Sequence, residues 1–222
     1  MKEFYYTPDI IRGKAEEMLE SSSYAARRRE SGIVPKRPAL LVLDMQAYFL
    51  ESESHAFVPS GRAIIPVIKN LINAFHASKM PVIFTRHENT PENAGQMGVW
   101  WREILLPGHP LGGIIPELEP DGHRVITKSQ YDAFYKTDLS EVLQGMGVTQ
   151  VVVTGLMAHL CCETTARSAF MRGYEVYFLV DGTASYEESL HKAALLSLSH
   201  GFATLVLAEE VLSSLESPSA SK

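Results

Sequence analysis

Acidic, basic and thiol side chains stand at the ends of short apolar segments in this chain. Asp44 follows ALLVL, Lys128 follows RVIT, and Cys161 lies in the loop after VVVT. A free cysteine has a pKa of about 8.5 and needs a cation or a base beside it to attack a carbonyl at neutral pH. Because Lys128 offers the positive charge and Asp44 a proton acceptor, the three residues together predict an activated nucleophile.

The position of Cys161 adds to this prediction. The residue directly precedes a helical segment at 163–172, where unpaired N–H groups and the positive end of the helix dipole favour a thiolate and its oxyanion. Each residue alone also has a simpler interpretation: Asp44 as a turn residue or helix cap, and Lys128 as a solvated lysine. A lone unpaired cysteine is often a small buried apolar residue, and we interpret the adjacent Cys162 in that way.

Short Val-, Ile- and Leu-rich runs alternate with longer stretches of helical periodicity from residue 37 onward, which is typical of βαβ units. The pattern predicts an α/β fold: a three-layer, doubly wound sandwich with a six-stranded, mainly parallel sheet and helices on both faces. The expected strands are 39–44, 82–86, 124–127, 151–154, 176–180 and 204–207, and the expected helices after the first strand are 61–78, 138–145, 163–172 and 187–200.

In an open parallel sheet the ligand crevice lies outside the carboxyl ends of the strands. The reactive side chains that end the expected strands should therefore converge on one rim. They are Asp44, Arg86, His87, Lys128, the 155–161 loop and Asp181.

Three segments complete the expected organisation. We expect an N-terminal helical arm over 1–36, one compact domain over 37–212 and a flexible tail over 213–222. The connection 88–122 holds five prolines, six glycines and the pair Trp100-Trp101. It is too long for a passive link and is a candidate lid or partner surface.

Composition narrows the class of function. The 222 residues are 45% hydrophobic and 21% charged, as in an ordinary globular protein, and the formal charge of −6 argues against a broad nucleic-acid surface. No apolar run approaches the roughly 20 residues that span a bilayer, so we expect no membrane segment. Residues 1–16 lack the features of a signal peptide, which predicts a cytoplasmic protein.

Motifs for metals and cofactors are missing from the sequence. The loop histidines do not have the short spacing of a strong zinc site; they are His55, His87, His109 and His123. No Gly-x-Gly-x-x-Gly follows the first strand and no phosphate loop is present, so we expect neither a metal nor a cofactor. His159 offers a base or a metal ligand, although its position favours a hydrogen bond that orients its loop.

Three stretches together resemble the isochorismatase-like superfamily of cysteine hydrolases, which includes nicotinamidases, N-carbamoylsarcosine amidohydrolases and isochorismatases. They are ALLVLDMQAYF at 39–49, TKSQYDAFYKTDL at 127–139 and VVVTGLMAHLCCETTARSAFMRGYEVYFLVDGTASY at 151–186. The resemblance runs from about residue 37 to residue 208. It implies that Asp44, Lys128 and Cys161 form the catalytic triad.

The resemblance also implies finer details of the site. A cis peptide should join Leu156 to Met157, and the backbone N–H groups of Met157 and Cys161 should form the oxyanion hole. The residues expected to contact the substrate are Gln46, Phe49, Arg86, Tyr131, Phe134 and His159.

Two departures from the family patterns bear on the substrate. The segment 158–160 together with Tyr131, Ala133 and Phe134 looks more like the isochorismatase branch, yet enzymes of that branch that cleave a vinyl ether often carry glycine where this chain has Cys161. The Asp-x-His that binds metal in nicotinamidases is replaced by Arg-His-Glu at 86–88.

These features predict a metal-independent hydrolase that cleaves a C–N bond of a small amide or ureido compound through a Cys161 thioester. One alternative is an isochorismatase, in which Asp44 protonates a vinyl ether and Arg86 or Lys128 holds a carboxylate. Another is a non-catalytic binding or scaffold protein. The basic run 27–29 and the Trp pair predict a homo-oligomer, a dimer or a tetramer, that acts on a small molecule.

Overall fold

The computed structural model describes residues 2–21, 36–120 and 122–216. Its sheet has six strands in the order β3-β2-β1-β4-β5-β6, and every neighbouring pair is parallel. The strands are β1 (Pro38–Leu43), β2 (Val82–His87), β3 (Arg124–Lys128), β4 (Gln150–Leu156), β5 (Glu175–Ala184) and β6 (Thr204–Val206). This confirms the predicted doubly wound α/β sheet.

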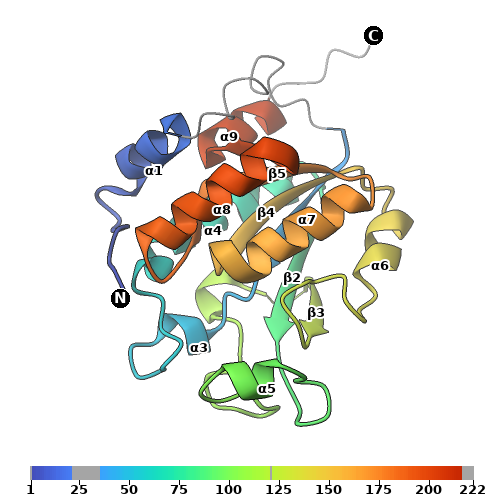
Figure 1. Cartoon of the computed structure of the whole chain (residues 1–222). Coiled ribbons are helices and arrows are strands. Elements are labelled where there is room, and N and C mark those ends of the chain that lie inside the picture. The colour runs from blue at the N-terminus through green and yellow to red at the C-terminus, as the bar shows by residue number, and fades with distance from the viewer. Residues whose placement is uncertain (1, 22–35, 121, 217–222) are drawn as a thin grey trace.

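Helices cover both faces of the sheet, as expected for right-handed crossovers. In Figure 1 the helices α7 and α8 cross the near face, while α4 lies behind the strands and contacts α9. The helical segments are α1 (Ile11–Glu20), α3 (Ala47–Leu50), η1 (Pro59–Ile64), α4 (Ile65–Ala77), α5 (Met97–Trp100), η2 (Pro116–Leu118), α6 (Leu139–Gly145), η3 (Ala158–Cys162), α7 (Glu163–Met171), α8 (Glu188–Gly201) and α9 (Ala208–Glu216).

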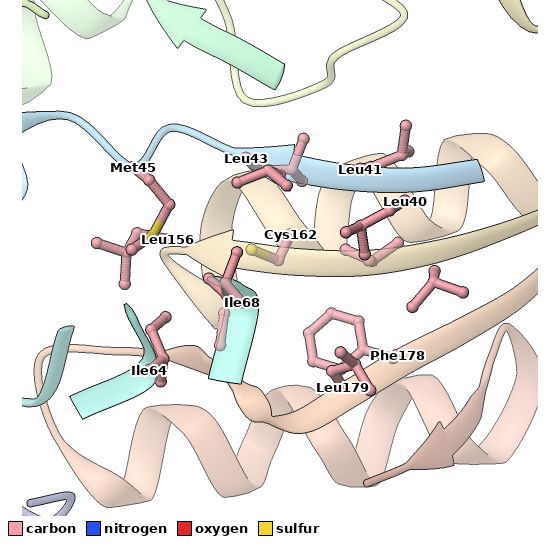
Figure 2. Packing of buried hydrophobic residues seen from close by; sticks show 14 of the residues in the cluster. Leu40, Leu41, Leu43, Met45, Ile64, Ile68, Leu156, Cys162, Phe178 and Leu179 are labelled. Atoms are coloured by element: carbon pink, nitrogen blue, oxygen red, sulfur yellow. The ribbon is translucent and has the colours of Figure 1, made fainter. Parts of the chain in front are cut away.

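The core lies between the sheet and these helices. β1 is buried along its whole length because both of its faces are covered, which explains its run of apolar residues rather than an alternation. Figure 2 shows buried side chains of β1, α4 and β5 together with Cys162, all members of one hydrophobic cluster. Leu40, Ile68 and Phe178 of this group are fully buried, and so is Cys162, as predicted.

The two ends of the chain differ from expectation. Within the expected arm α1 is helical, and Tyr6, Ala15 and Met18 are buried in the same core as the sheet rather than on a solvated arm. The rest of the arm, at 22–35, lies outside the described residues. At the other end α9 continues to Glu216, so the first four residues of the expected tail are helical; residues 217–222 also lie outside the description. Amphipathic packing of α9 outweighs the Ser-rich composition there, since Val211 is buried against the core.

A buried histidine links the N-terminal segment to the sheet. The Nε2 and Nδ1 atoms of His191 lie 3.0 Å from Thr183 Oγ1 and 3.0 Å from Tyr5 Oη, respectively. Because Thr183 donates its proton to the carbonyl of Leu179, it must accept from Nε2–H, and Nδ1 then accepts from Tyr5. The ring is thus held in its neutral form.

Stability should therefore fall in mild acid. Burial lowers the pKa of His191 to about 3, whereas the pKa of a histidine in an unfolded chain is about 6.5. Between these two pKa values only the unfolded chain takes up the proton. The free energy of unfolding should therefore fall by up to about 1.4 kcal/mol for each unit by which the pH decreases. Urea unfolding between pH 7.5 and 5 measures this. The free energy of unfolding should depend less steeply on pH in His191→Gln. An equal dependence in both proteins would contradict the buried, neutral state of His191.

Candidate active site

Asp44 directly follows β1 in a left-handed conformation with φ 50°, which aspartate tolerates better than most residues. Its carboxylate is fully buried. Oδ1 accepts a 2.6 Å hydrogen bond from Thr85 of β2, and Oδ2 forms a 2.7 Å ion pair with Lys128 Nζ at the end of β3. Three neighbouring strands therefore fix this carboxylate.

Lys128 bridges the acid and the thiol. Besides Asp44, its Nζ lies 3.3 Å from Cys161 Sγ and 2.9 Å from the carbonyl oxygen of Gln130. The ammonium group therefore makes two hydrogen bonds and one ion pair. Asp44 and Cys161 also lie close enough for each to shift the pKa of the other.

The loop that carries Cys161 needs an unusually close approach of β4 to β1. Gly155, with φ 108°, pairs with Leu43, and a Cβ atom at this position would lie 2.0 Å from the Leu43 carbonyl oxygen. Only glycine fits there. The peptide between Leu156 and Met157 is cis, as the resemblance implied, and the π-helical turn η3 then leads Cys161 to the triad.

Burial and neighbouring charges shift the pKa values of the triad. Burial and the adjacent Asp44 carboxylate raise the pKa of Cys161 to about 12, against the opposite pull of Lys128. Burial would also raise the pKa of Asp44, but Lys128 and the hydrogen bonds from Cys161 and Lys128 hold it below its ordinary value. Burial lowers the pKa of Lys128, but the Asp44 carboxylate and the contact with Cys161 outweigh that effect and raise it. Burial and Asp44 thus favour the neutral thiol, whereas Lys128 favours the thiolate suggested by the residue types.

A pocket opens above Cys161. It has about 540 Å³ of volume, counting its opening to solvent. Most of its wall is aromatic or aliphatic, and a few polar side chains interrupt it. The lining residues are Tyr48, Phe49, His55, Ala56, His87, Asn89, Met97, Trp101, Glu103, Ile104, Leu105, Tyr131, Met157, Leu160, Cys161 and Tyr186.

The long connection 88–122 supplies much of this wall. It contributes Met97, Trp101 and Leu105, and Trp101 Nε1 donates a 2.8 Å hydrogen bond to Tyr131 Oη on the opposite side. The returning end of the connection is fixed by backbone hydrogen bonds, such as Tyr48 N to the Leu111 carbonyl, 2.8 Å. The connection therefore covers the site, in keeping with the lid interpretation.

The structure brings several of the predicted substrate contacts to this pocket. Phe49 and Tyr131 line it, as do the two residues of the expected oxyanion hole, Met157 and Cys161. His159 lines an adjoining hollow beside Trp100 and accepts or donates a 2.9 Å hydrogen bond with Ser185 through Nδ1. This contact orients its loop, as the sequence favoured.

Three predicted substrate contacts lie elsewhere. Gln46 is fully buried, and its amide is occupied by the backbone of His87 and Gly112. Arg86 lies outside the pocket and donates to Thr127, because successive residues of a strand face opposite sides and His87 takes the inner one. Phe134 packs against Tyr174 and the guanidinium of Arg172.

Asp181, which was expected at the rim, caps a helix instead. β5 continues past it to Ala184, and both carboxylate oxygens accept from the N–H of Ala208 at the start of α9. Anions are favoured at this end of a helix. The irregular register between β4 and β5, which shifts around Val153 and Gly155, moves this residue away from the crevice.

Sequence reasoning placed His87 at the rim without a role in the pocket, and it missed Asn89 and Thr85 as parts of the site. The alternation of β2 was an available signal, since residues 85 and 87 share a face. It also missed a cluster at the pocket edge, where Glu103 Oε1 lies 2.8 Å from His55 Nδ1 and accepts a 3.1 Å hydrogen bond from Tyr48. His55 and Glu103 come from loops and Tyr48 from the short helix α3, and no local pattern indicates that they meet.

The N-terminal segment holds two walls of the pocket together. Lys2 Nζ donates a 2.5 Å hydrogen bond to the His55 carbonyl and lies 4.6 Å from the ring centroid of Tyr186. Glu3 N donates to the Tyr186 carbonyl, 2.7 Å. Both His55 and Tyr186 line the pocket.

Lys2→Ala should therefore weaken substrate binding more than turnover. Loss of one cation–π contact and one hydrogen bond should raise KM about two- to fivefold and change kcat less than about twofold. Steady-state kinetics measure this. Lys14→Ala is the control, because Lys14 pairs with Glu17 and Glu188 on the outer surface. An equal effect of both variants would contradict the role of Lys2.

Within the described ranges no group of three or more His, Cys, Asp or Glu side chains is arranged to hold a metal ion. The same ranges contain no helix that is long and apolar enough to cross a membrane.

Comparison with known proteins agrees with this geometry. The isochorismatase domain model matches residues 38–210. Nicotinamidase 3 of Arabidopsis thaliana is 38% identical over 207 residues, which cover 89% of this chain and 98% of that protein. An isochorismatase of Bacillus subtilis is 31% identical over 188 residues, covering 82% of this chain and 59% of the relative.

A solved structure shares the fold. The cysteine hydrolase from Pseudomonas syringae pv. phaseolicola superposes with a TM-score of 0.79 at 28% identity and covers 83% of this chain and 94% of its own. With the domain match and the 38% identical relative, the family is established. This chain belongs to the isochorismatase-like family of hydrolases.

Proposed function

We propose that this protein hydrolyses the C–N bond of a small amide through a thioester on Cys161. One observation carries the proposal: Lys128 Nζ bridges Asp44 Oδ2 at 2.7 Å and Cys161 Sγ at 3.3 Å beside the pocket. A thiol next to an ionised carboxylate becomes a nucleophile when the carboxylate takes its proton.

The steps follow from these positions. As Cys161 Sγ attacks the carbonyl carbon, its proton passes to Asp44, which stays beside Lys128. The N–H groups of Met157 and Cys161 stabilise the oxyanion. Asp44 then gives the proton to the leaving nitrogen, and the C–N bond breaks. Water attacks the thioester, Asp44 takes a proton from that water, and the proton returns to Sγ as the acid leaves.

The substrate class is drawn from the pocket and from the relatives. Rings of Tyr48, Phe49 and Trp101 line the wall, and flat apolar acyl groups bury well against such rings. A relative 38% identical is named a nicotinamidase. We therefore propose an aromatic or similarly flat carboxamide, with ammonia as the product.

Isochorismate hydrolysis is the second candidate, because one relative 31% identical is named an isochorismatase. That reaction was expected to use Arg86 or Lys128 to hold a carboxylate. Arg86 donates to Thr127 outside the pocket, and Lys128 already contacts Asp44, Cys161 and the Gln130 carbonyl. These contacts favour an amide over isochorismate as the substrate.

The decisive experiment is a substrate panel. Nicotinamide, benzamide, smaller aliphatic amides, ureido acids and isochorismate are incubated with the enzyme, and ammonia and pyruvate are measured separately. We expect ammonia, and mass spectrometry after acid quench should find the acyl group on Cys161. Pyruvate without ammonia would replace our proposal with the second candidate. No turnover, with Cys161 alkylated no faster than Cys162, would indicate a binding protein.

A further inference from the structure

His87 is a buried histidine in the pocket wall that the steps above do not use. It ends β2 and is 8% exposed. The side chain of Gln46 holds its peptide from both sides: His87 N donates to Gln46 Oε1 at 2.7 Å, and Gln46 Nε2 donates to the His87 carbonyl at 3.0 Å. The backbone of His87 is therefore fixed at the site.

The protonation of its ring follows from Asn89. The Nδ2 group of Asn89 donates a 2.8 Å hydrogen bond to the Ser129 carbonyl, which can only accept. The Oδ1 atom of Asn89 must then be the one that faces His87 Nε2, 2.8 Å away. Because this oxygen also only accepts, Nε2 carries the proton and Nδ1 presents a bare lone pair.

No described residue satisfies that lone pair. Nδ1 of His87 is buried and has no hydrogen-bond partner in the protein. A buried acceptor without a partner is costly, so such an atom at a site commonly has a role there. Burial and the nearby Lys128 ammonium lower the pKa of His87 to about 4, so the ring remains a neutral acceptor at neutral pH.

We propose that His87 Nδ1 accepts a hydrogen bond from the N–H of the scissile amide and thereby selects amides over esters that carry the same acyl group. The inference rests on the function proposed above. An ester or ether oxygen has no proton to offer this acceptor, and a site built for an N–H discriminates against a substrate that lacks it. The same Nδ1 atom can accept a hydrogen bond from the water that replaces ammonia and hydrolyses the thioester.

The test compares two substrates that share one acyl group, nicotinamide and methyl nicotinate, or the matching pair for whichever amide the panel selects. His87→Phe keeps a ring and removes the acceptor. We expect kcat/KM for the amide to fall about 30- to 100-fold and that for the ester to change less than about threefold. His87→Asn keeps an acceptor near the Nδ1 position and should recover part of the amide activity. His87→Ala serves for the same comparison if the phenylalanine variant does not fold.

The outcomes separate this inference from the function on which it rests. An amide-to-ester ratio that stays at the wild-type value in His87→Phe or His87→Ala overturns the role of His87. A Cys161→Ala enzyme that still releases ammonia overturns the thioester mechanism instead, whatever the ratio is.

Discussion

Cys161→Ala is expected to reduce kcat for amide hydrolysis at least about 10⁴-fold. The substitution removes the only atom that forms the thioester, and loss of a nucleophile typically costs this much or more. Asp44 and Lys128 remain, paired at 2.7 Å, so the variant should fold and bind substrate. Ammonia release and a thermal melt measure the two properties separately.

The neighbouring cysteine provides a matched control. Cys162 is fully buried among the core side chains in Figure 2, and its Sγ makes one long contact, 3.9 Å, with the Thr154 carbonyl. Cys162→Ala should cost about 1 kcal/mol of stability through lost packing and leave kcat within about threefold. A Cys161→Ala enzyme with near wild-type turnover, or an inactive but folded Cys162→Ala enzyme, would reject the assignment of the nucleophile.

The sequence was sufficient to predict the strands and the meeting of Asp44, Lys128 and Cys161. Each strand is a local apolar run, and each triad member stands at a strand end or in the loop after one. Parallel pairing then brings Asp44, Lys128 and Cys161 together at one edge, whatever the details of the loops. The ion pair at 2.7 Å and the 3.3 Å contact follow from the topology.

The residues that line the pocket were harder to predict, because they depend on the exact register of a strand and on how the loops pack. The expected end of β2 was one residue short, and that residue decides whether Arg86 or His87 faces the pocket. Phe134 could be assigned only by knowing that Tyr174 and Arg172 lie beside it. These contacts join segments distant in sequence.

The effect of burial on the Cys161 thiol could not be predicted for a different reason. Residue types alone suggested that Lys128 would hold a thiolate, but the same lysine is already neutralised by Asp44 at 2.7 Å. Full burial then favours the neutral thiol and raises its pKa to about 12. Burial is a property of the whole fold, which explains why spacing and composition did not reveal it.

Lys128→Met is expected to lower both activity and stability. It leaves the Asp44 carboxylate buried without its cation, and breaking a buried ion pair in this way costs about 3–5 kcal/mol. Activity should fall about 10³-fold or more, because an Asp44 that has become protonated cannot accept the Cys161 proton. Urea unfolding and ammonia release measure the two losses. Lys69→Met, which breaks an exposed pair with Glu119, should change stability by less than about 1 kcal/mol.

The pH dependence of these losses distinguishes an electrostatic cause from general damage to packing. In the wild type the pKa of Asp44 lies below its ordinary value, so this group stabilises the fold above about pH 4 and the contribution is lost in acid. Without Lys128, burial raises that pKa above the unfolded value, and stability should instead fall as the pH rises from about 4. The double variant Asp44→Asn with Lys128→Met removes both charges, so it should regain most of the stability, lose the pH dependence and stay inactive. A double variant as unstable as Lys128→Met would assign the lost stability to packing instead.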